Sequence, residues 1–293
     1  MRLFGLFLLF ALACLLAAAL LHYPLYVLLS GLVEGVRPHR VLYRAAMVLA
    51  ALGLWPLLRA LGMNHRRVLG YGLPRPAFLR RMLSGWLAGV AILALLSGAL
   101  FALEIRHLRP EGLPGWPRLA GLATGALFAG LLVALIEETF FRGILYTAVR
   151  RSSGFWTAAL ATAAFYASVH FLRPPPLPAG AEVSWGTGLE LLLGAFANYH
   201  DPLALLDSWA ALFAVGLFLA LVRERDGHIA HTIGLHAGWV FVIKLTRSLS
   251  AADPQAPAAA LVGGYDGVIG WLAAGWIGLL GLSLWFRWRP LRP

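Results

Sequence analysis

Long apolar runs limit this chain to one kind of fold. In a bilayer every backbone N–H and C=O group needs a partner within the protein, so an apolar run of about 20 residues crosses as a helix. Hydrophobic residues make up 60% of the 293 residues and charged residues only 13%, which excludes an ordinary soluble domain. We expect an all-α, polytopic transmembrane helical bundle of about eight spans. The expected spans are 3–33, 41–58, 83–103, 119–146, 155–172, 203–222, 229–249 and 260–286.

Basic residues predict how the spans are oriented. The segment between the second and third spans carries the strongest signal, and arginine-rich loops of this kind stay in the cytoplasm. Its arginines are Arg59, Arg66, Arg67, Arg75, Arg80 and Arg81. With the N-terminus also inside, the inner segments hold more basic residues than the outer ones. We expect a multi-pass protein of the cell inner membrane, in contact with the lipid bilayer.

Charge and cysteine content narrow the functional classes. The formal net charge is +11, but the basic residues are spread between apolar runs, so we expect no nucleic-acid partner. Apart from Lys244 they are all arginines, as coding in a GC-rich bacterial genome tends to give. Cys14 is the single cysteine, which rules out an intrachain disulfide and a cysteine-based zinc cluster.

Three regions are expected along the chain. Residues 1–82 form an N-terminal transmembrane region with the basic cytoplasmic loop, residues 83–250 a core, and residues 251–293 a C-terminal transmembrane helix with a basic tail. Between Arg173 and Pro202, a proline-rich stretch that cannot be a regular helix precedes a short amphipathic helix. A lid or re-entrant segment and a solvated outer loop are equally compatible with that pattern.

Two adjacent carboxylates, Glu137 and Glu138, close the apolar run 119–136. A carboxylate at mid-membrane costs about 2.5–3.5 kcal/mol on insertion scales, so it indicates a functional site unless a partner explains it. Arg142 lies four residues after Glu138 on the same helical face and predicts an ion pair. Glu137 has no such local counter-charge.

Two histidines on other predicted spans are candidates to meet these carboxylates. His170 closes the fifth span and His236 lies in the seventh, whereas His231, five residues before His236, falls on a different face. Three helices would then each bring a titratable group into the bundle, as a buried acid–base cluster requires. Unrelated polar residues in the core are an equally good explanation of the residue types alone.

The spacing of these residues is more specific. Glu137 to Arg142 matches EExxxR, Tyr166 to His170 approximates FxxxH, and His236 begins an Hxxx(N) element. In this order on three helices, the motifs resemble the CPBP family of intramembrane proteases, also called type II CAAX prenyl proteases or the abortive-infection-like family. The resemblance covers roughly residues 84–250.

The resemblance implies a role for each residue. In the family the first glutamate and the second-motif histidine activate a water that attacks a peptide carbonyl, which gives these roles to Glu137 and His170. Glu138 and Arg142 become the supporting pair. His236 would help to stabilise the oxyanion.

This sequence departs from the family pattern at two positions. Tyr166 replaces a phenylalanine, and Val240 stands where the family usually has an asparagine, so a hydrogen-bond donor is missing. Trp239 and Lys244 are candidate replacements. A further difficulty is that His170 lies near the outer end of its span while Glu137 and His236 lie in the cytoplasmic halves of theirs. We therefore expect the fifth span to be tilted or to stop within the membrane.

The leading hypothesis is an endopeptidase that cuts a membrane-associated protein or peptide. A non-proteolytic membrane partner, such as an immunity or scaffolding protein, is kept open by Val240, and a proton-coupled transporter is a weaker alternative because the chain has no internal repeat. One glutamate and two histidines also match the ligand number of a catalytic zinc. The sequence has no HExxH motif, and we expect no metal or other cofactor, with zinc as the alternative. It does not set the oligomeric state.

Overall fold

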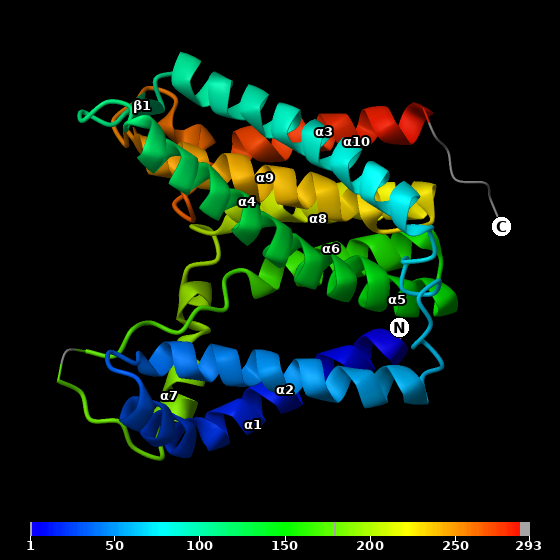
Figure 1. Cartoon of the computed structure of the whole chain (residues 1–293), viewed down its shortest axis with the longest axis vertical. Coiled ribbons are helices and arrows are strands. Elements are labelled where there is room, and N and C mark those ends of the chain that lie inside the picture. Colours follow the sequence, from blue (N-terminus) through cyan, green and yellow to red (C-terminus); the bar gives the residue numbers. More distant parts are fainter. Residues whose placement is uncertain (1, 179, 288–293) are drawn as a thin grey trace. The chain divides into compact units, whose positions relative to one another are not determined.

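The computed structural model describes residues 2–178 and 180–287, and its helices and short strands are labelled in Figure 1. The chain divides into two compact units. The first consists of Met1–Asn64 and Ser168–Pro202, and the second of His65–Ala167 and Leu203–Pro293. The basic tail expected at the C-terminus falls largely on residues 288–293, outside the described residues.

The first unit is built on two long helices, α1 (Arg2–Leu32) and α2 (Pro38–Ala60), with the short helix α7 (Thr187–Gly194) packed against both. A Cβ atom at Gly188 would lie 2.0 Å from the carbonyl oxygen of Ala19, so only glycine lets α7 approach α1 this closely. The 3-10 helix η2 (Ala197–His200) follows α7. The proline-rich stretch before α7 holds no regular helix among its described residues.

The second unit is a helical bundle. Its long helices are joined by a π-helical segment and short connections, and two short strands close one end. The elements are α3 (Arg75–Ala102), β1 (Arg106–Leu108), α4 (Trp116–Glu138), η1 (Thr139–Leu145), α5 (Tyr146–Ser152), α6 (Phe155–Val169), α8 (Leu206–Asp226), α9 (Ala230–Leu249), β2 (Ser250–Ala252), η3 (Ala259–Leu261) and α10 (Trp271–Arg287).

Helix α9 packs against α3, α4 and α8. Glycines bring these backbones together: a Cβ at Gly234 would lie 2.0 Å from the carbonyl oxygen of Met82, and one at Gly130 would lie 2.7 Å from that of Ala237. Small residues spaced by four allow such close packing of membrane helices. The face of α9 that carries His236 is thereby held against α4.

The antiparallel pair β1–β2 was not expected from the sequence. Arg106 is buried beneath it and donates hydrogen bonds to the Ser250 side chain (2.8 Å), the Ser250 carbonyl (3.0 Å) and the Gly267 carbonyl (2.6 Å). Burial lowers the pKa of Arg106, while the charge of Asp266 acts in the opposite direction. The guanidinium therefore replaces its hydration with backbone and hydroxyl oxygens.

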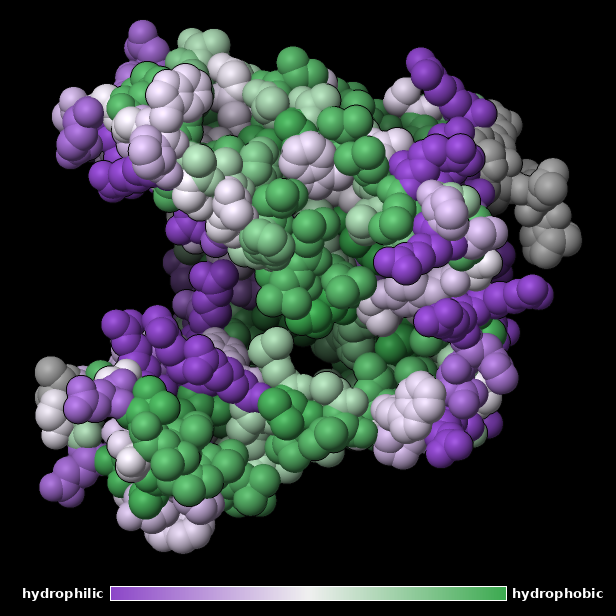
Figure 2. All heavy atoms as spheres, in the orientation of Figure 1, coloured by the Kyte–Doolittle hydropathy of each residue, from purple (hydrophilic) through white to green (hydrophobic). Residues whose placement is uncertain are grey.

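The predicted all-α membrane bundle is confirmed. Every expected span contains a helix, and five helices of the described chain are long and apolar enough to cross a membrane. Helices α6 and α10 are shorter, so the count of about eight spans stays a prediction. Figure 2 shows hydrophilic residues gathered at the two ends of the second unit, with apolar side chains between them.

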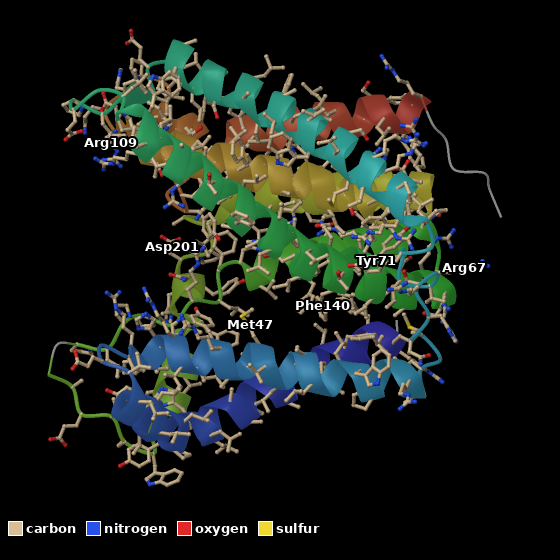
Figure 3. All side chains as sticks on the ribbon, viewed as in Figure 1. Met47, Arg67, Tyr71, Arg109, Phe140 and Asp201 are labelled. Atoms are coloured by element: carbon tan, nitrogen blue, oxygen red, sulfur yellow. The ribbon has the colours of Figure 1, made fainter. Side chains whose placement is uncertain are left out.

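The structure separates the predicted outer and cytoplasmic segments of the second unit, while the orientation itself stays a prediction. In Figure 3, Arg109 and Arg67 lie at opposite ends of its helices. Arg109 belongs to a predicted outer segment and Arg67 to the basic cytoplasmic loop. The proposed boundaries at residues 82 and 250 stay a prediction: the contacts place residues 251–287 in the same unit as most of the expected core, but residues 168–202 of that core in the first unit.

Candidate active site

The two carboxylates end a regular helix. Glu138 is the last residue of α4, and the chain continues directly into the π-helical segment η1. Such segments leave the regular hydrogen-bond ladder and are frequent at functional sites. The sequence predicted a continuous helix here, and the π-helical segment was missed because its pattern of apolar residues does not differ from that of an α-helix.

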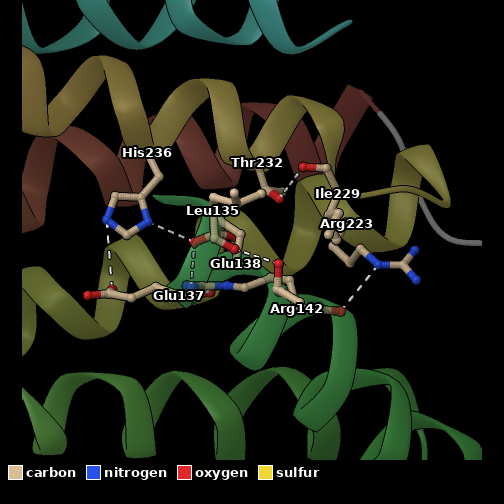
Figure 4. Close-up of polar contacts among 10 residues, drawn as sticks. Leu135, Glu137, Glu138, Arg142, Arg223, Ile229, Thr232 and His236 are labelled. Carbon is tan, nitrogen blue, oxygen red and sulfur yellow. Dashed lines mark hydrogen bonds and ion pairs between the residues drawn. The ribbon is translucent and has the colours of Figure 1, made fainter. Parts of the chain in front are cut away.

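Glu138 is buried in a network of charged groups. Its Oε1 atom accepts a hydrogen bond from Nη1 of Arg142 at 2.8 Å and lies 2.9 Å from Nδ1 of His236 (Figure 4). The ion pair predicted from the spacing of Glu138 and Arg142 is therefore present, with both side chains almost fully buried. The Arg142 guanidinium also lies over the Tyr166 ring, 4.5 Å from its centroid, a favourable cation–π arrangement.

His236 joins the two glutamates. Because Glu138 accepts from Arg142, it is a carboxylate, and Nδ1 of His236 must carry the hydrogen that is donated to it. The other ring nitrogen, Nε2, lies 3.8 Å from Oε2 of Glu137, which is too long for a direct hydrogen bond (Figure 4). His236 is thus oriented by one glutamate and presents its second nitrogen to the other.

The two glutamates differ in access. The side chain of Glu138 has no exposed surface, whereas that of Glu137 is 28% exposed. The Oε2 atom of Glu137 that lies beside His236 is itself buried, so the exposed surface of this side chain lies on its other atoms. The ion pair of Glu138 and Arg142 balances one negative and one positive charge, which lowers the cost of placing them within a membrane helix bundle.

Residues outside the three motifs support this arrangement. Thr139, next to Glu138, donates its hydroxyl hydrogen to the carbonyl of Leu135, so Tyr71 must be the donor in its hydrogen bond of 2.5 Å to Thr139. Burial raises the pKa of the Tyr71 hydroxyl, which keeps this donor protonated. Tyr71 comes from the basic loop before α3, and its role was not foreseen because neither its spacing nor its surroundings in the sequence point to α4.

The comparison with protein families covers this part of the chain. Residues 119–242 match the family described as type II CAAX prenyl endopeptidase Rce1-like. This segment is an Rce1-like domain. The match confirms the resemblance to the CPBP family and identifies the domain as one of a protease family of the membrane. No curated protein and no solved structure gave a match.

The matched segment contains all five predicted site residues of the Rce1-like domain. Glu137, Glu138, Arg142 and His236 are brought together within the second unit. His170 lies in the turn directly after α6, in the segment assigned to the first unit. Its role beside Glu137 stays a prediction.

The helix that precedes His170 is short. Helix α6 has 15 residues, and at 1.5 Å per residue it is about 22 Å long, less than the hydrocarbon thickness of about 30 Å. Whether the fifth span is tilted or stops within the membrane stays a prediction.

The two candidates to replace the missing asparagine of the Rce1-like motif differ in position. Lys244 is exposed, whereas Trp239 is buried on the side of α9 that meets Phe218 of α8. The indole N–H of Trp239 has no hydrogen-bond partner among the described residues. Trp239 is therefore the better candidate for an additional donor. Val240 itself is partly buried.

Proposed function

We propose that this protein is an intramembrane endopeptidase in which Glu137 activates the attacking water. The observation that carries the proposal is that the two glutamates differ in burial and in their contacts. Glu138 is fully buried and bound by Arg142 and His236, while the side chain of Glu137 is partly exposed and places its buried Oε2 atom beside Nε2 of His236. An accessible carboxylate beside a fixed imidazole is the arrangement that general-base activation of water needs.

In this proposal the residues act in sequence on one peptide bond. Glu137 takes a proton from water, and the oxygen of that water attacks the peptide carbonyl, with His170 as the predicted second group that orients it. His236, protonated and held by Glu138, donates its Nε2 hydrogen to the oxyanion that forms. The proton taken by Glu137 then passes to the leaving amine. Arg142 keeps Glu138 charged, so that Glu138 continues to hold His236.

We propose that the reaction needs no metal. The proposed roles need none, because Glu137 takes the proton from water while His170 orients that water and His236 stabilises the oxyanion. In the described part of the chain, the three metal-ligating side chains that lie close enough to share an ion belong to a different cluster. If zinc did bind here, Glu137, His170 and His236 would hold it and it would polarise the attacking water.

The substrate is proposed to be a membrane-associated protein or peptide of the inner membrane. The description of the family names a prenyl endopeptidase, but a prenylated cysteine is not required by the groups at this site. Only a peptide carbonyl has to reach Glu137 from within the bundle.

The test is mass spectrometry of a membrane-peptide library incubated with the purified full-length protein. Glu137→Ala is the comparison, and each protein is tested with and without a chelator. We expect fragments from the wild type in both conditions and none from Glu137→Ala. Equal fragments from both proteins would refute the protease assignment and favour a scaffolding role. Loss of cleavage with chelator that zinc restores, under conditions where the chelator leaves the protein folded and its melting temperature unchanged, would replace the metal-free mechanism by a zinc-dependent one.

A further inference from the structure

A second histidine–carboxylate cluster lies at the end of α8 and the start of α9. Asp226, His228 and His231 each offer one ligand atom, and these three atoms lie within 4.8 Å of one another. Asp226 is the last residue of α8 and His231 is in the first turn of α9, so the short connection between the helices brings the three together. None of them belongs to the proposed protease site.

The hydrogen bonds around His231 fix which of its nitrogens carries hydrogen. Ser84 of α3 donates its single hydroxyl hydrogen to the carbonyl of Arg81 at 2.9 Å. Ser84 must therefore accept at its second contact, and Nε2 of His231, 3.0 Å away, is the donor. Nδ1 of His231 contacts the carboxylate of Asp226. A lone pair on Nδ1 would repel that carboxylate, so at this short contact Nδ1 carries a hydrogen, which a metal ion would replace once the two atoms move apart.

His228 favours the metal. Its side chain is 9% exposed, and its Nδ1 atom is buried without a hydrogen-bond partner among the described residues. The rings of His228 and His231 are 5.6 Å apart. A proton on His231 would satisfy Asp226 but not His228, whereas a metal ion takes a ligand from each of the three residues.

We propose that Asp226, His228 and His231 bind a divalent transition-metal ion, with zinc the best fit. Two imidazoles and one carboxylate are a common ligand set for such ions. The N–H that His231 donates to Ser84 is the outer hydrogen bond that metal-binding histidines usually make. Ligand atoms of a tetrahedral zinc ion lie about 3.3–3.6 Å apart for bonds of about 2.0–2.2 Å, so the carboxylate of Asp226 and Nδ1 of His231 have to move apart to admit the ion.

The charges nearby set the selectivity of the site. The positive charges of Arg81 and Arg223 act on His228. They oppose a hard cation such as Mg²⁺ or Ca²⁺, which depends on oxygen ligands and charge. Zinc and cobalt gain from the two imidazole nitrogens and tolerate this environment better. Bound there, the ion would join the ends of α8 and α9, and through Ser84 it would also fix α3.

The backbone places this cluster beside the predicted cytoplasmic loop. The N–H of Ile229 donates to the carbonyl of Gly70 at 3.1 Å, and a Cβ at Gly70 would lie 3.0 Å from the Ile229 side chain. Gly70 also has φ +83, a conformation that suits glycine. The proposed site would therefore lie at the predicted cytoplasmic end of the second unit. Zinc would enter it from that side of the membrane.

The test is titration of the full-length protein with Co²⁺ after treatment with a chelator and removal of any histidine tag. Visible absorption reports nitrogen and oxygen coordination, and added Zn²⁺ should displace the cobalt. We expect one Co²⁺ per chain and a rise in melting temperature. Asp226→Asn and His228→Gln should weaken binding by at least about tenfold, and Ser84→Ala, which keeps all three ligands, by about tenfold.

Two matched controls separate this site from others. His107 pairs with Asp253 at 3.8 Å, with both side chains exposed, so His107→Gln removes a histidine beside an aspartate elsewhere and should leave cobalt binding unchanged. Glu137→Gln should also leave it unchanged. The proposal is overturned if the wild type does not bind cobalt, if His228→Gln binds it as the wild type does, or if Glu137→Gln abolishes binding.

Discussion

Two histidines of α9, His236 and His231, each contact a carboxylate from a neighbouring helix, but the two contacts differ in their other partners. At His236, the carboxylate of Glu138 is also bound by Arg142, so the ring is held firmly while its second nitrogen remains available beside Glu137. At His231, Asp226 meets the ring directly, and the second nitrogen is used by Ser84. In the first cluster Arg142 and Nδ1 of His236 share the carboxylate of Glu138, and Nε2 of His236 stays available for catalysis. In the second, both nitrogens are engaged and a bound cation fits better.

The largest effect on stability is expected from Glu138→Ala. The substitution leaves Arg142 buried without its carboxylate, and breaking a buried ion pair by removing one partner costs about 3–5 kcal/mol. Cleavage should be lost as well, because His236 loses the group that orients it. Thermal unfolding in detergent and the peptide assay measure the two effects. Wild-type stability in this variant would show that Glu138 and Arg142 do not form the structural pair.

His236→Gln should reduce catalysis more than stability. Glutamine keeps a polar group near Glu138 but cannot carry the positive charge proposed at Nε2. Removing one oxyanion donor typically lowers the rate by about 10²–10³-fold, and we expect a loss in kcat of this size. Kinetics with a defined peptide substrate provide the measurement. An unchanged kcat would exclude His236 from the reaction and leave its ring a purely structural bridge.

Much of this first cluster could be predicted from the sequence. The spacing of Glu138 and Arg142 predicted their ion pair, and the third motif placed His236 with them, because each relation depends on helix periodicity or on a motif. The supporting contacts could not be predicted. Tyr71 reaches Thr139 only through the tertiary fold, and the closeness of Asp226 and His228 to His231 depends on a tight connection that hydropathy does not describe.

The fold, too, has elements that the sequence predicts and others that depend on tertiary contacts. Apolar runs predict helices reliably because a membrane leaves few alternatives. The two-stranded β1–β2 pair is too short to leave a periodic pattern, and it depends on Arg106 being satisfied by residues from the far end of the chain. The sequence shows the glycines of α3 and α9, but it does not show which backbone atoms of the neighbouring helix they approach.

Gly234→Ala tests the packing that places His236. The added Cβ would lie 2.0 Å from the carbonyl oxygen of Met82, so α3 and α9 must move apart. Overpacking of this kind costs about 1–3 kcal/mol. A lower melting temperature with reduced cleavage is expected. Gly98→Ala on α3 is the matched control, because its added Cβ meets nothing within 4 Å. Equal stability of the two variants would contradict the role of this close approach.

The smallest effect is expected from His107→Ala. This histidine faces Asp253 at 3.8 Å, and the two side chains are 55% and 41% exposed. Exposed pairs contribute about 0–1 kcal/mol, so stability and cleavage should stay close to those of the wild type. Unfolding measurements at low and high salt check this. If His107→Ala lowered the cleavage rate as much as His236→Gln does, the exposure of a histidine would not predict its importance for the reaction.

The central claim, that Glu137 is the catalytic base and Glu138 its support, is tested most directly by single-turnover cleavage. Wild type and Glu137→Gln would be reconstituted in the same lipid and given the same labelled membrane peptide. Because the side chain of Glu137 is partly exposed, whereas that of Glu138 is fully buried in its pair with Arg142, we predict an unchanged melting temperature and a cleavage rate lower by about 10²–10⁴-fold. A Glu137→Gln protein that cleaves at the wild-type rate would contradict the account.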